Sequence, residues 1–328
     1  REAQVLFLRE IRRVARRAFV TTPNRWFPAE VHTRTPFLHW LPKRWFDRYL
    51  MGRKRATAIG EMPQVTQYVY GRERYETFRD WPNPRIDPER LYLRGDGLLR
   101  RTRPATDEAS QTFLQQPLSG VCTQSTSQWT AGLGEAIPCT QDNRLDELGS
   151  AVYTTPVAER PIQLIGPALA DLWVTTTARE AVLAVRVTDV APNGTSTELT
   201  GGWLAASFRE LDRERSRFVR GELLQPWHPF TKRSVLPVTP GKPTRMRVEI
   251  FPTAAVIKPG HSLRVTIGPS DFPHQVPPLP QLTNALAGQV EILTDPEHPS
   301  FIETPGVRSC KRETCRPLPV ADLLRRRR

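Results

Sequence analysis

The chain has 328 residues, of which 38% are hydrophobic and 25% charged, a composition typical of a folded globular protein rather than a disordered one. No apolar run approaches the roughly 18 residues that a membrane-spanning helix needs, which excludes a spanning protein. Proline is frequent, with 32 residues, and proline breaks helix interiors and central strands. The composition therefore disfavours a mostly helical fold.

The net charge of +13 is concentrated at the two ends of the chain. Residues 1–60 carry 14 Lys and Arg against 4 Asp and Glu, and residues 306–328 carry 8 against 2. Residues 61–305 have 25 basic against 28 acidic side chains. Nucleic-acid binders usually carry a basic face on the folded domain itself, so we expect no nucleic-acid partner.

The first part of the chain mixes helix and strand signals. Apolar residues between Val5 and Phe19 follow helical spacing, with arginines opposite, and predict a packed amphipathic helix; binding to a membrane surface is the alternative. A strand is expected at Phe19–Thr22, a second helix within Pro36–Leu50 and another strand at Gln64–Tyr70. Because the sequence starts without Met, we expect a fragment or an N-terminally truncated product.

A proline-rich segment around residue 84 is followed by a long series of predicted short strands. Val182–Val190 alternates with a period of two residues, which places Arg186 on the face opposite Val185. The next turn predicts a hairpin in which Asn193 and Gly194 both have positive φ. Further strands are expected at Leu91–Leu93, Leu172–Thr177, Trp203–Phe208, Arg245–Phe251 and Ser262–Gly268. Short strands without intervening helices predict an antiparallel sandwich or jelly roll.

Four cysteines form two local pairs. Cys122 and Cys139 flank a stretch rich in Ser, Thr and Gly, and Cys310 and Cys315 flank only four residues. Neither pair has Cys-x-x-Cys spacing, so a zinc site is not expected. An even count in two short loops favours two disulfides and an extracellular or periplasm-like compartment, with free buried thiols as the alternative.

Motifs that carry enzyme chemistry are missing from the sequence. An α/β serine hydrolase needs Gly-x-Ser-x-Gly, and the nearest candidate, Gly268-Pro269-Ser270, has Phe272 where the second glycine should stand. Phosphate-binding glycine loops are also missing, and the histidines have no identifiable nucleophile beside them. We therefore assign no catalytic, cofactor-binding or metal-binding residue, and expect no cofactor.

Aromatic residues allow two interpretations. Those of a β-sandwich usually fill the core between its sheets, which is where we expect the tryptophans. The alternative is an exposed face that stacks against a carbohydrate. The four tryptophans concerned are Trp129, Trp173, Trp203 and Trp227.

An ordered series of short motifs resembles one enzyme family. The motifs are Trp45–Leu50, Leu91–Gly97, Asp189–Gly194, Pro259–His261 and Ser270–Pro273. In this order they are similar to landmarks of the cocaine esterase and Xaa-Pro dipeptidyl-peptidase family of serine hydrolases. The resemblance implies a mainly β chain: residues 1–84 as the remnant of an α/β-hydrolase catalytic domain, residues 85–305 as a jelly-roll β-sandwich, and residues 306–328 as a basic tail.

The same resemblance implies that the catalytic triad is incomplete in this chain. The family's serine and aspartate would precede Arg1. Trp26 occupies the expected histidine position after the strand at Phe19–Thr22, and His32 comes too late. We therefore carry over no catalytic role.

The implied function is the non-catalytic, C-terminal part of a hydrolase that cleaves esters, amides or Xaa-Pro peptides. The α/β-hydrolase and cap domains of the same protein would be its partners, and the jelly roll would support the active-site cleft. Without those domains, Gln64–Tyr70 is expected to present an unpaired strand edge. The alternative is a free-standing β-sandwich that binds carbohydrate or protein.

Overall fold

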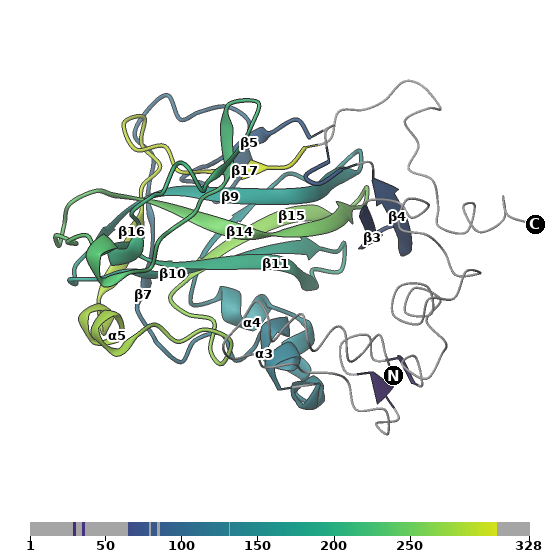
Figure 1. Ribbon diagram of the computed structural model, residues 1–328, viewed down its shortest axis with the longest axis horizontal. Coiled ribbons are helices and arrows are strands. Elements are labelled where there is room, and N and C mark those ends of the chain that lie inside the picture. Colours follow the sequence, from purple (N-terminus) through teal and green to yellow (C-terminus); the bar gives the residue numbers. More distant parts are fainter. Residues whose placement is uncertain are drawn as a thin grey trace, which may run out of the picture. The chain divides into compact units, whose positions relative to one another are not determined.

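The computed structural model describes residues 65–78, 80–83, 86–130 and 132–306, together with two short strands near the N-terminus (Figure 1). These strands, β1 (Ala29–Glu30) and β2 (Thr35–Pro36), pair antiparallel. The chain divides into two compact units, residues 1–64 and 65–328. Pro36 belongs to β2 instead of the second predicted helix. The rest of that helix, the first helix, the strand at Phe19–Thr22 and Trp26 lie outside the described residues.

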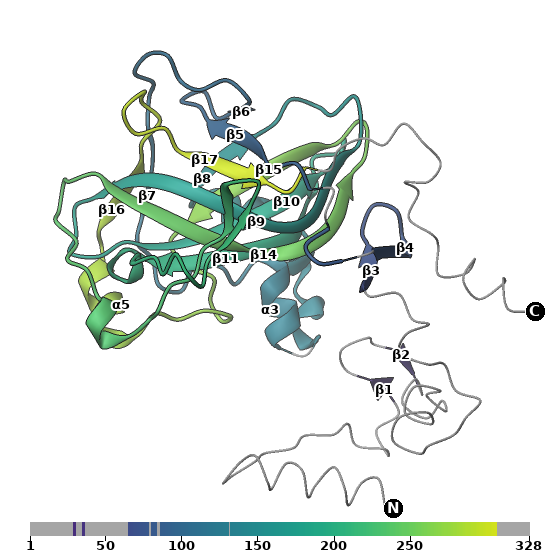
Figure 2. The same cartoon turned by 45° about the horizontal axis from the view of Figure 1, so that its top comes forward.

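Two antiparallel sheets make up most of the second unit (Figure 2). The smaller sheet has the order β11 (Ser196–Ala205), β10 (Val182–Val190), β15 (Ser262–Gly268) and β8 (Ala151–Thr154). The larger sheet has the order β6 (Leu99–Arg100), β5 (Glu89–Leu93), β17 (Phe301–Thr304), β9 (Ile162–Thr176), β16 (Gln289–Ile292) and β7 (Gln111–Leu114), and β14 (Thr244–Ile257) pairs with β9. The prediction of a mainly β, antiparallel chain is therefore confirmed.

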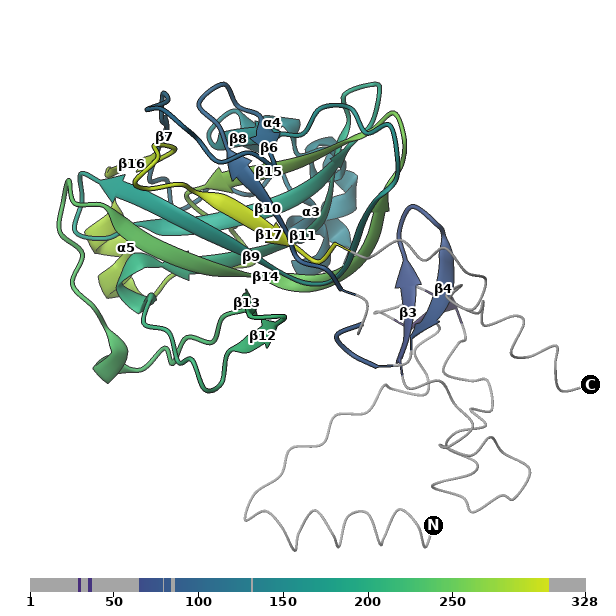
Figure 3. The same cartoon turned by 90° about the horizontal axis from the view of Figure 1, so that it is seen from above.

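Strands of both sheets can be followed in Figure 3. Their buried side chains form one shared apolar core. Alternation in β10 turns Leu183 and Val185 into this core, where Leu172 of β9 and Val248 of β14 also lie fully buried. Burying such a side chain stabilises the fold by roughly 1.5–3 kcal/mol. The opposite face of β10 carries Arg186, as the period of two residues predicts.

The long strands β9 and β14 each place a proline at the same irregularity. Their register shifts between Ile250 and Thr253, where Pro252 lies across from Pro167. Proline lacks the N–H that a sheet ladder needs, so both prolines are tolerated where the ladder is already interrupted. Gly166 has a φ of 140° there, a conformation that favours glycine.

A close approach between β11 and β14 requires another glycine. A Cβ atom on Gly202 would lie 1.7 Å from the carbonyl oxygen of Glu249, so no larger residue fits there without moving a strand. The approach brings Trp203 of β11 next to Phe251 of β14, with ring centroids 5.1 Å apart.

The strand predicted at Gln64–Tyr70 is present as β3 (Val65–Val69), and within the described residues one of its edges is paired along its whole length. β4 (Arg74–Phe78) pairs with β3 in an antiparallel hairpin. Tyr70 also forms a parallel bridge with Ala255 of β14: its N–H donates to the Ala254 carbonyl oxygen at 2.9 Å. The hairpin therefore satisfies one edge locally and attaches to the larger sheet through its end.

The turn between β10 and β11 forms a hairpin as predicted, but by a different conformation. Gly194 has a φ of 86°, whereas Asn193 does not enter the left-handed region. Gly194 N–H donates to the Ala191 carbonyl oxygen at 2.8 Å, and Ala191 N–H donates to that of Thr195 at 3.0 Å. A single left-handed glycine is typical of the longer hairpin loops, not of a two-residue Asn-Gly turn.

Short helices interrupt the β part, contrary to the expectation that helices nearly vanish. They are α3 (Gln124–Trp129), α4 (Arg144–Glu147) and α5 (Leu279–Ala285), with the 3₁₀ helices η3 (Leu133–Ala136), η4 (Pro138–Gln141), η5 (Ala206–Phe208) and η6 (Lys232–Ser234). The strand predicted at Trp203–Phe208 therefore ends at Ala205. A small hairpin, β12 (Arg217–Val219) with β13 (Glu222–Gln225), completes the described elements. Helices this short depend on tertiary contacts.

Candidate functional site

Residues 118–150, here called the covering segment, pack on the outer face of the four-stranded sheet. This segment contains α3, η3, η4 and α4. A disulfide joins Cys122 to Cys139, with the two Cα atoms 4.9 Å apart. Glu147 of α4 accepts a hydrogen bond of 2.5 Å from Arg264 of β15, which fixes the segment to the sheet. The second predicted pair, Cys310 and Cys315, lies outside the described residues.

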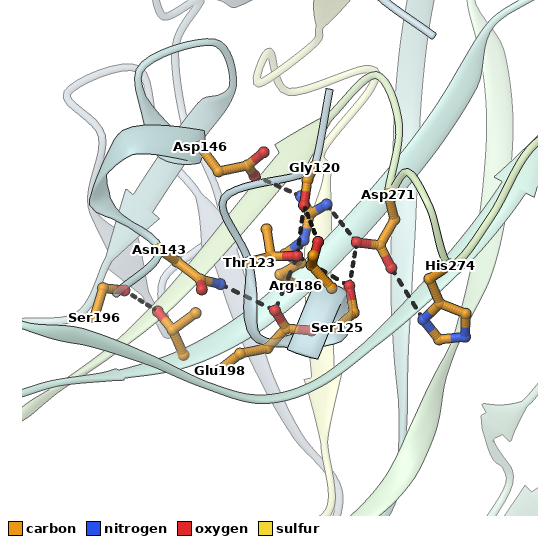
Figure 4. A network of polar contacts seen from close by, with 12 residues as sticks. Gly120, Thr123, Ser125, Asn143, Asp146, Arg186, Ser196, Glu198, Asp271 and His274 are labelled. Atoms are coloured by element: carbon orange, nitrogen blue, oxygen red, sulfur yellow. Dashed lines mark hydrogen bonds and ion pairs between the residues drawn. The ribbon is translucent and has the colours of Figure 1, made fainter. Parts of the chain in front are cut away.

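A buried arginine lies between the sheet and the covering segment (Figure 4). The side chain of Arg186 is only 2% exposed. Its Nη1 donates to Asp146 Oδ2 at 2.7 Å, and its Nη2 donates to Asp271 Oδ1 at 2.8 Å and to the Ser270 carbonyl oxygen at 2.9 Å. Two carboxylates thus compensate the guanidinium, as a buried charge requires.

Asp271, in the loop after β15, ties three parts of the fold together. Besides Arg186 of β10, its carboxylate accepts a hydrogen bond from Ser125 Oγ of α3 at 2.6 Å. Trp203 Nε1 of β11 donates to its other oxygen at 3.1 Å. These contacts fix the loop, the covering segment and the edge strand of the sheet in one arrangement.

A third acid, Glu198, joins this network from β11. It lies opposite Thr188 of β10 and therefore on the same outer face as Arg186. Asn143 Nδ2 donates to its Oε2 at 3.0 Å, and Arg186 Nε lies 3.9 Å from that oxygen. Burial raises the pKa of Glu198 to about 7, although the nearby Arg186 opposes this shift. Its carboxyl group therefore titrates near neutral pH.

A pocket of about 210 Å³ opens beside Glu198. Trp203, Phe251 and His274 form its aromatic walls, and the ring centroids of Trp203 and His274 are 4.3 Å apart. Trp129 of α3 stacks on the same histidine at 4.6 Å. Burial lowers the pKa of His274, which keeps the imidazole neutral at neutral pH.

The tryptophans do not fill the core, so that prediction is wrong. Trp129 and Trp227 are 59% and 48% exposed, and Trp173 and Trp203 are half-buried. Strand alternation explains Trp203, because its partner across the sheet, Ala184, lies on the outer face of β10. Mostly aliphatic side chains, together with Phe113 and Tyr153, occupy the core instead.

A larger pocket, of about 440 Å³, lies on the outer face of the seven-stranded sheet. Charged side chains in it pair with one another. Asp171 accepts two hydrogen bonds from Arg245, at 2.7 and 2.8 Å, and Glu303 accepts one from Arg90 at 2.7 Å. This pattern is typical of a structural ion-pair network.

The remaining described histidines are held by structural contacts. Both ring nitrogens of His228 lie 2.8 Å from backbone carbonyl oxygens, and Nδ1 of His261 lies 2.8 Å from Asp189 Oδ1. Within the described ranges, no group of three or more His, Cys, Asp and Glu is arranged to hold a metal ion. No helix in that part of the chain is long and apolar enough to cross a membrane.

Sequence reasoning placed Arg186 on the correct face but missed the site around it. A lone arginine at an alternating position in an otherwise apolar strand was the available signal for a buried ion pair. Asp271 and Asp146 could not be found in this way, because they reach Arg186 from a loop and from the short helix α4, both distant in sequence.

Comparison with known proteins identifies similar chains. A Mycobacterium bovis protein named as a serine esterase is 24% identical over 265 residues, which cover 81% of this chain and 40% of that protein. Cocaine esterase of Rhodococcus is 24% identical over 282 residues, covering 81% of this chain and 45% of that protein. The chain thus spans less than half the length of these relatives.

Solved structures show the same fold. A CocE/NonD family hydrolase of Staphylococcus aureus superposes with a TM-score of 0.59 at 18% identity, over 81% of this chain and 45% of that one. The family model described as X-Pro dipeptidyl-peptidase C-terminal non-catalytic domain matches residues 57–303. Because this match takes in most of the sequence, the chain belongs to the family of X-Pro dipeptidyl-peptidase C-terminal non-catalytic domains.

Proposed function

We propose that this chain is the C-terminal part of a serine hydrolase whose complete form cleaves esters, amides or Xaa-Pro peptides, and that it supports the active-site cleft. The observation that carries the proposal is the match of residues 57–303 to a non-catalytic domain. Relatives named as esterases extend over more than twice the matched length. The nucleophile would belong to the part that this sequence does not contain.

The covering segment supports a docking role. It exposes a group of large apolar side chains, namely Leu118, Val121, Trp129, Leu133, Ile137, Leu145 and Leu148. Exposed apolar side chains gathered on one short segment are typical of an interaction surface. In this proposal they face the α/β-hydrolase and cap domains of the same protein, while the disulfide and Glu147 hold the surface in shape.

The proposed domain organisation keeps residues 1–84 as the end of the catalytic domain, residues 85–305 as a jelly roll and residues 306–328 as a basic tail. The β3–β4 hairpin then forms the junction, because it precedes residue 85 yet bonds to β14. The Cys122–Cys139 bridge supports folding of the parent protein in an oxidising, extracellular or periplasm-like compartment.

The test is to read the genomic sequence upstream of Arg1 and to express any continuous reading frame. The proposal expects a Gly-x-Ser-x-Gly or Gly-x-Ser-x-x-Gly motif there, and esterase or dipeptidyl-peptidase activity that is lost when its serine becomes alanine. A complete gene that starts at Arg1, or an upstream region without a hydrolase motif, would contradict it.

The alternative, a free-standing binding module, is favoured by one observation. Trp129, Trp203, Phe251 and His274 gather at a surface pocket rather than in the core. Under this alternative, the chain binds its ligand with full affinity in isolation and has no upstream hydrolase.

A further inference from the structure

We propose that the pocket beside Glu198 binds a small organic ammonium ion, such as the charged head group of a larger amine. The inference does not depend on the proposed hydrolase, because every residue it uses lies in the described part of this chain. Three features carry it: the charge at the base of the pocket, its aromatic walls and its size.

Negative charge exceeds positive charge at the base of the pocket. Asp146 and Asp271 already satisfy Arg186 through direct hydrogen bonds, so Glu198 adds a third carboxylate to a single guanidinium. Of the described ion pairs, Glu198 enters only that with Arg186, at 3.9 Å. An ionised Glu198 therefore leaves the group with an excess of negative charge that a bound cation would offset.

Glu198 is also the acid that reaches the pocket. It lines the pocket, whereas Asp146 and Asp271 do not. The Arg186 side chain is 2% exposed, yet its Nε has no hydrogen-bond acceptor. Arg186 and Glu198 are therefore close but are not joined by a hydrogen bond. The carboxylate is left available to a ligand on its pocket side.

The walls of the pocket suit a positive charge. Cations are attracted to the faces of aromatic rings, most strongly to tryptophan, and Trp203 lines the pocket together with Phe251. His274 does not repel a cation, because burial lowers the pKa of its imidazole. Gln128 and Ser125 add polar groups that can bond to N–H or hydroxyl groups of the ligand.

The size of the pocket limits what enters it. Pockets that enclose a drug-sized ligand measure roughly 300–1,000 Å³, so about 210 Å³ accommodates a head group rather than a large molecule. Millimolar affinity is expected for such a single head group, because few contacts offset the loss of translational freedom.

The test is a titration of the 328-residue chain with choline chloride at pH 8, in which choline replaces sodium at constant ionic strength. Tryptophan fluorescence and calorimetry are the readouts, and 3,3-dimethylbutan-1-ol is the uncharged isostere. We expect saturable binding of choline and none of the alcohol.

Variants separate the pocket from general charge effects. Glu198→Gln keeps an oxygen that can accept from Asn143 but removes the charge, and it should weaken choline binding at least tenfold. Glu303→Gln is the matched control, because Glu303 is also a buried acid, paired with Arg90 on the other sheet. It should leave choline binding unchanged.

Each other result overturns the proposal. No saturable choline binding, equal binding of the uncharged isostere, or equal loss in both variants would each show that the pocket does not recognise an ammonium ion through Glu198. Urea unfolding of both variants checks that a loss of binding does not reflect a loss of folded protein.

Discussion

Arg186 determines how the outer face of the four-stranded sheet is organised. Burying an isolated guanidinium is costly without acidic partners, and here Asp146 of α4 and Asp271 of the loop after β15 supply them. The same residue thereby links β10 to the covering segment and to the loop after β15. Its removal would leave two buried carboxylates without a counter-charge.

The first prediction concerns this arginine. Arg186→Met should lower the free energy of unfolding by about 3–5 kcal/mol, as expected when one partner of a buried ion pair is removed. Arg101→Met is the control: Arg101 pairs with Glu89 but is 78% exposed, and such pairs contribute about 1 kcal/mol or less. Urea denaturation measures both. Similar losses in the two variants would show that the buried network contributes little.

The second prediction concerns pH. Because the folded-state pKa of Glu198 is raised to about 7 from 4.5, the folded protein binds one more proton than the unfolded chain between these values. Stability should therefore fall as pH rises through this window, by up to about 3 kcal/mol. Glu198→Gln mimics the neutral acid, so it should match the wild type at pH 5 and exceed it at pH 8. Urea midpoints that differ equally at both pH values would refute this.

Among the elements, the covering segment depends most on a covalent bond. Three of its helices have four to six residues each, too few to be stable alone. The bridge between Cys122 and Cys139 closes this stretch at a sequence separation of 17. Loops of this length gain about 3 kcal/mol from a disulfide in the chain-entropy account.

The third prediction follows for a Cys122→Ser/Cys139→Ser variant. Chymotrypsin should cut this variant faster near Trp129 and Leu133, while cleavage near the exposed Trp227 stays unchanged as an internal control. Peptide mapping by mass spectrometry reports both sites. Unchanged cleavage near Trp129 would mean that packing on the sheet, rather than the bridge, orders the segment.

The fourth prediction concerns the β3–β4 hairpin. Val69 is fully buried with Ile165, Ala254 and Val256, so deleting the hairpin uncovers apolar surface on β9 and β14. A chain that starts at Val65 should bind less hydrophobic dye and resist more urea than a chain that starts at Arg85. If the shorter chain is equally stable and binds no more dye, the hairpin is not part of the β unit.

Sequence patterns predicted the strands that have one face in the core and the other outside it. The bounds of β10 and β15 follow directly from alternation, because a strand with one face in the core must repeat every two residues. The short helices escaped prediction, since contacts with the sheet and a disulfide stabilise them rather than local propensity. Trp203 was placed in the core for its size, whereas the alternation of its own strand sets it outside.

At the scale of the whole molecule, the site depends on contacts that sequence periodicity does not contain. Asp271 meets both Arg186 and Trp203 only because the loop after β15 returns to the outer face of the four-stranded sheet. The ordered motifs did identify the family, since they include turn residues such as Gly194 and Gly260, whose left-handed conformations the fold requires. The described residues from Val65 onward thus form two antiparallel sheets around one apolar core, with a buried ion network on the outer face of the four-stranded sheet.

Hydrolysis by the purified 328-residue chain tests this account most directly. The chain should be shown to be folded by cooperative urea unfolding, then assayed with p-nitrophenyl acetate and an Ala-Pro anilide, and labelled with a fluorophosphonate that reacts with activated serines. Under the proposed function the nucleophile lies outside this chain, and absence of a triad removes orders of magnitude in rate, so we expect no turnover above background and no label. A burst of product or stoichiometric labelling of a serine would contradict the assignment of this chain as a non-catalytic domain.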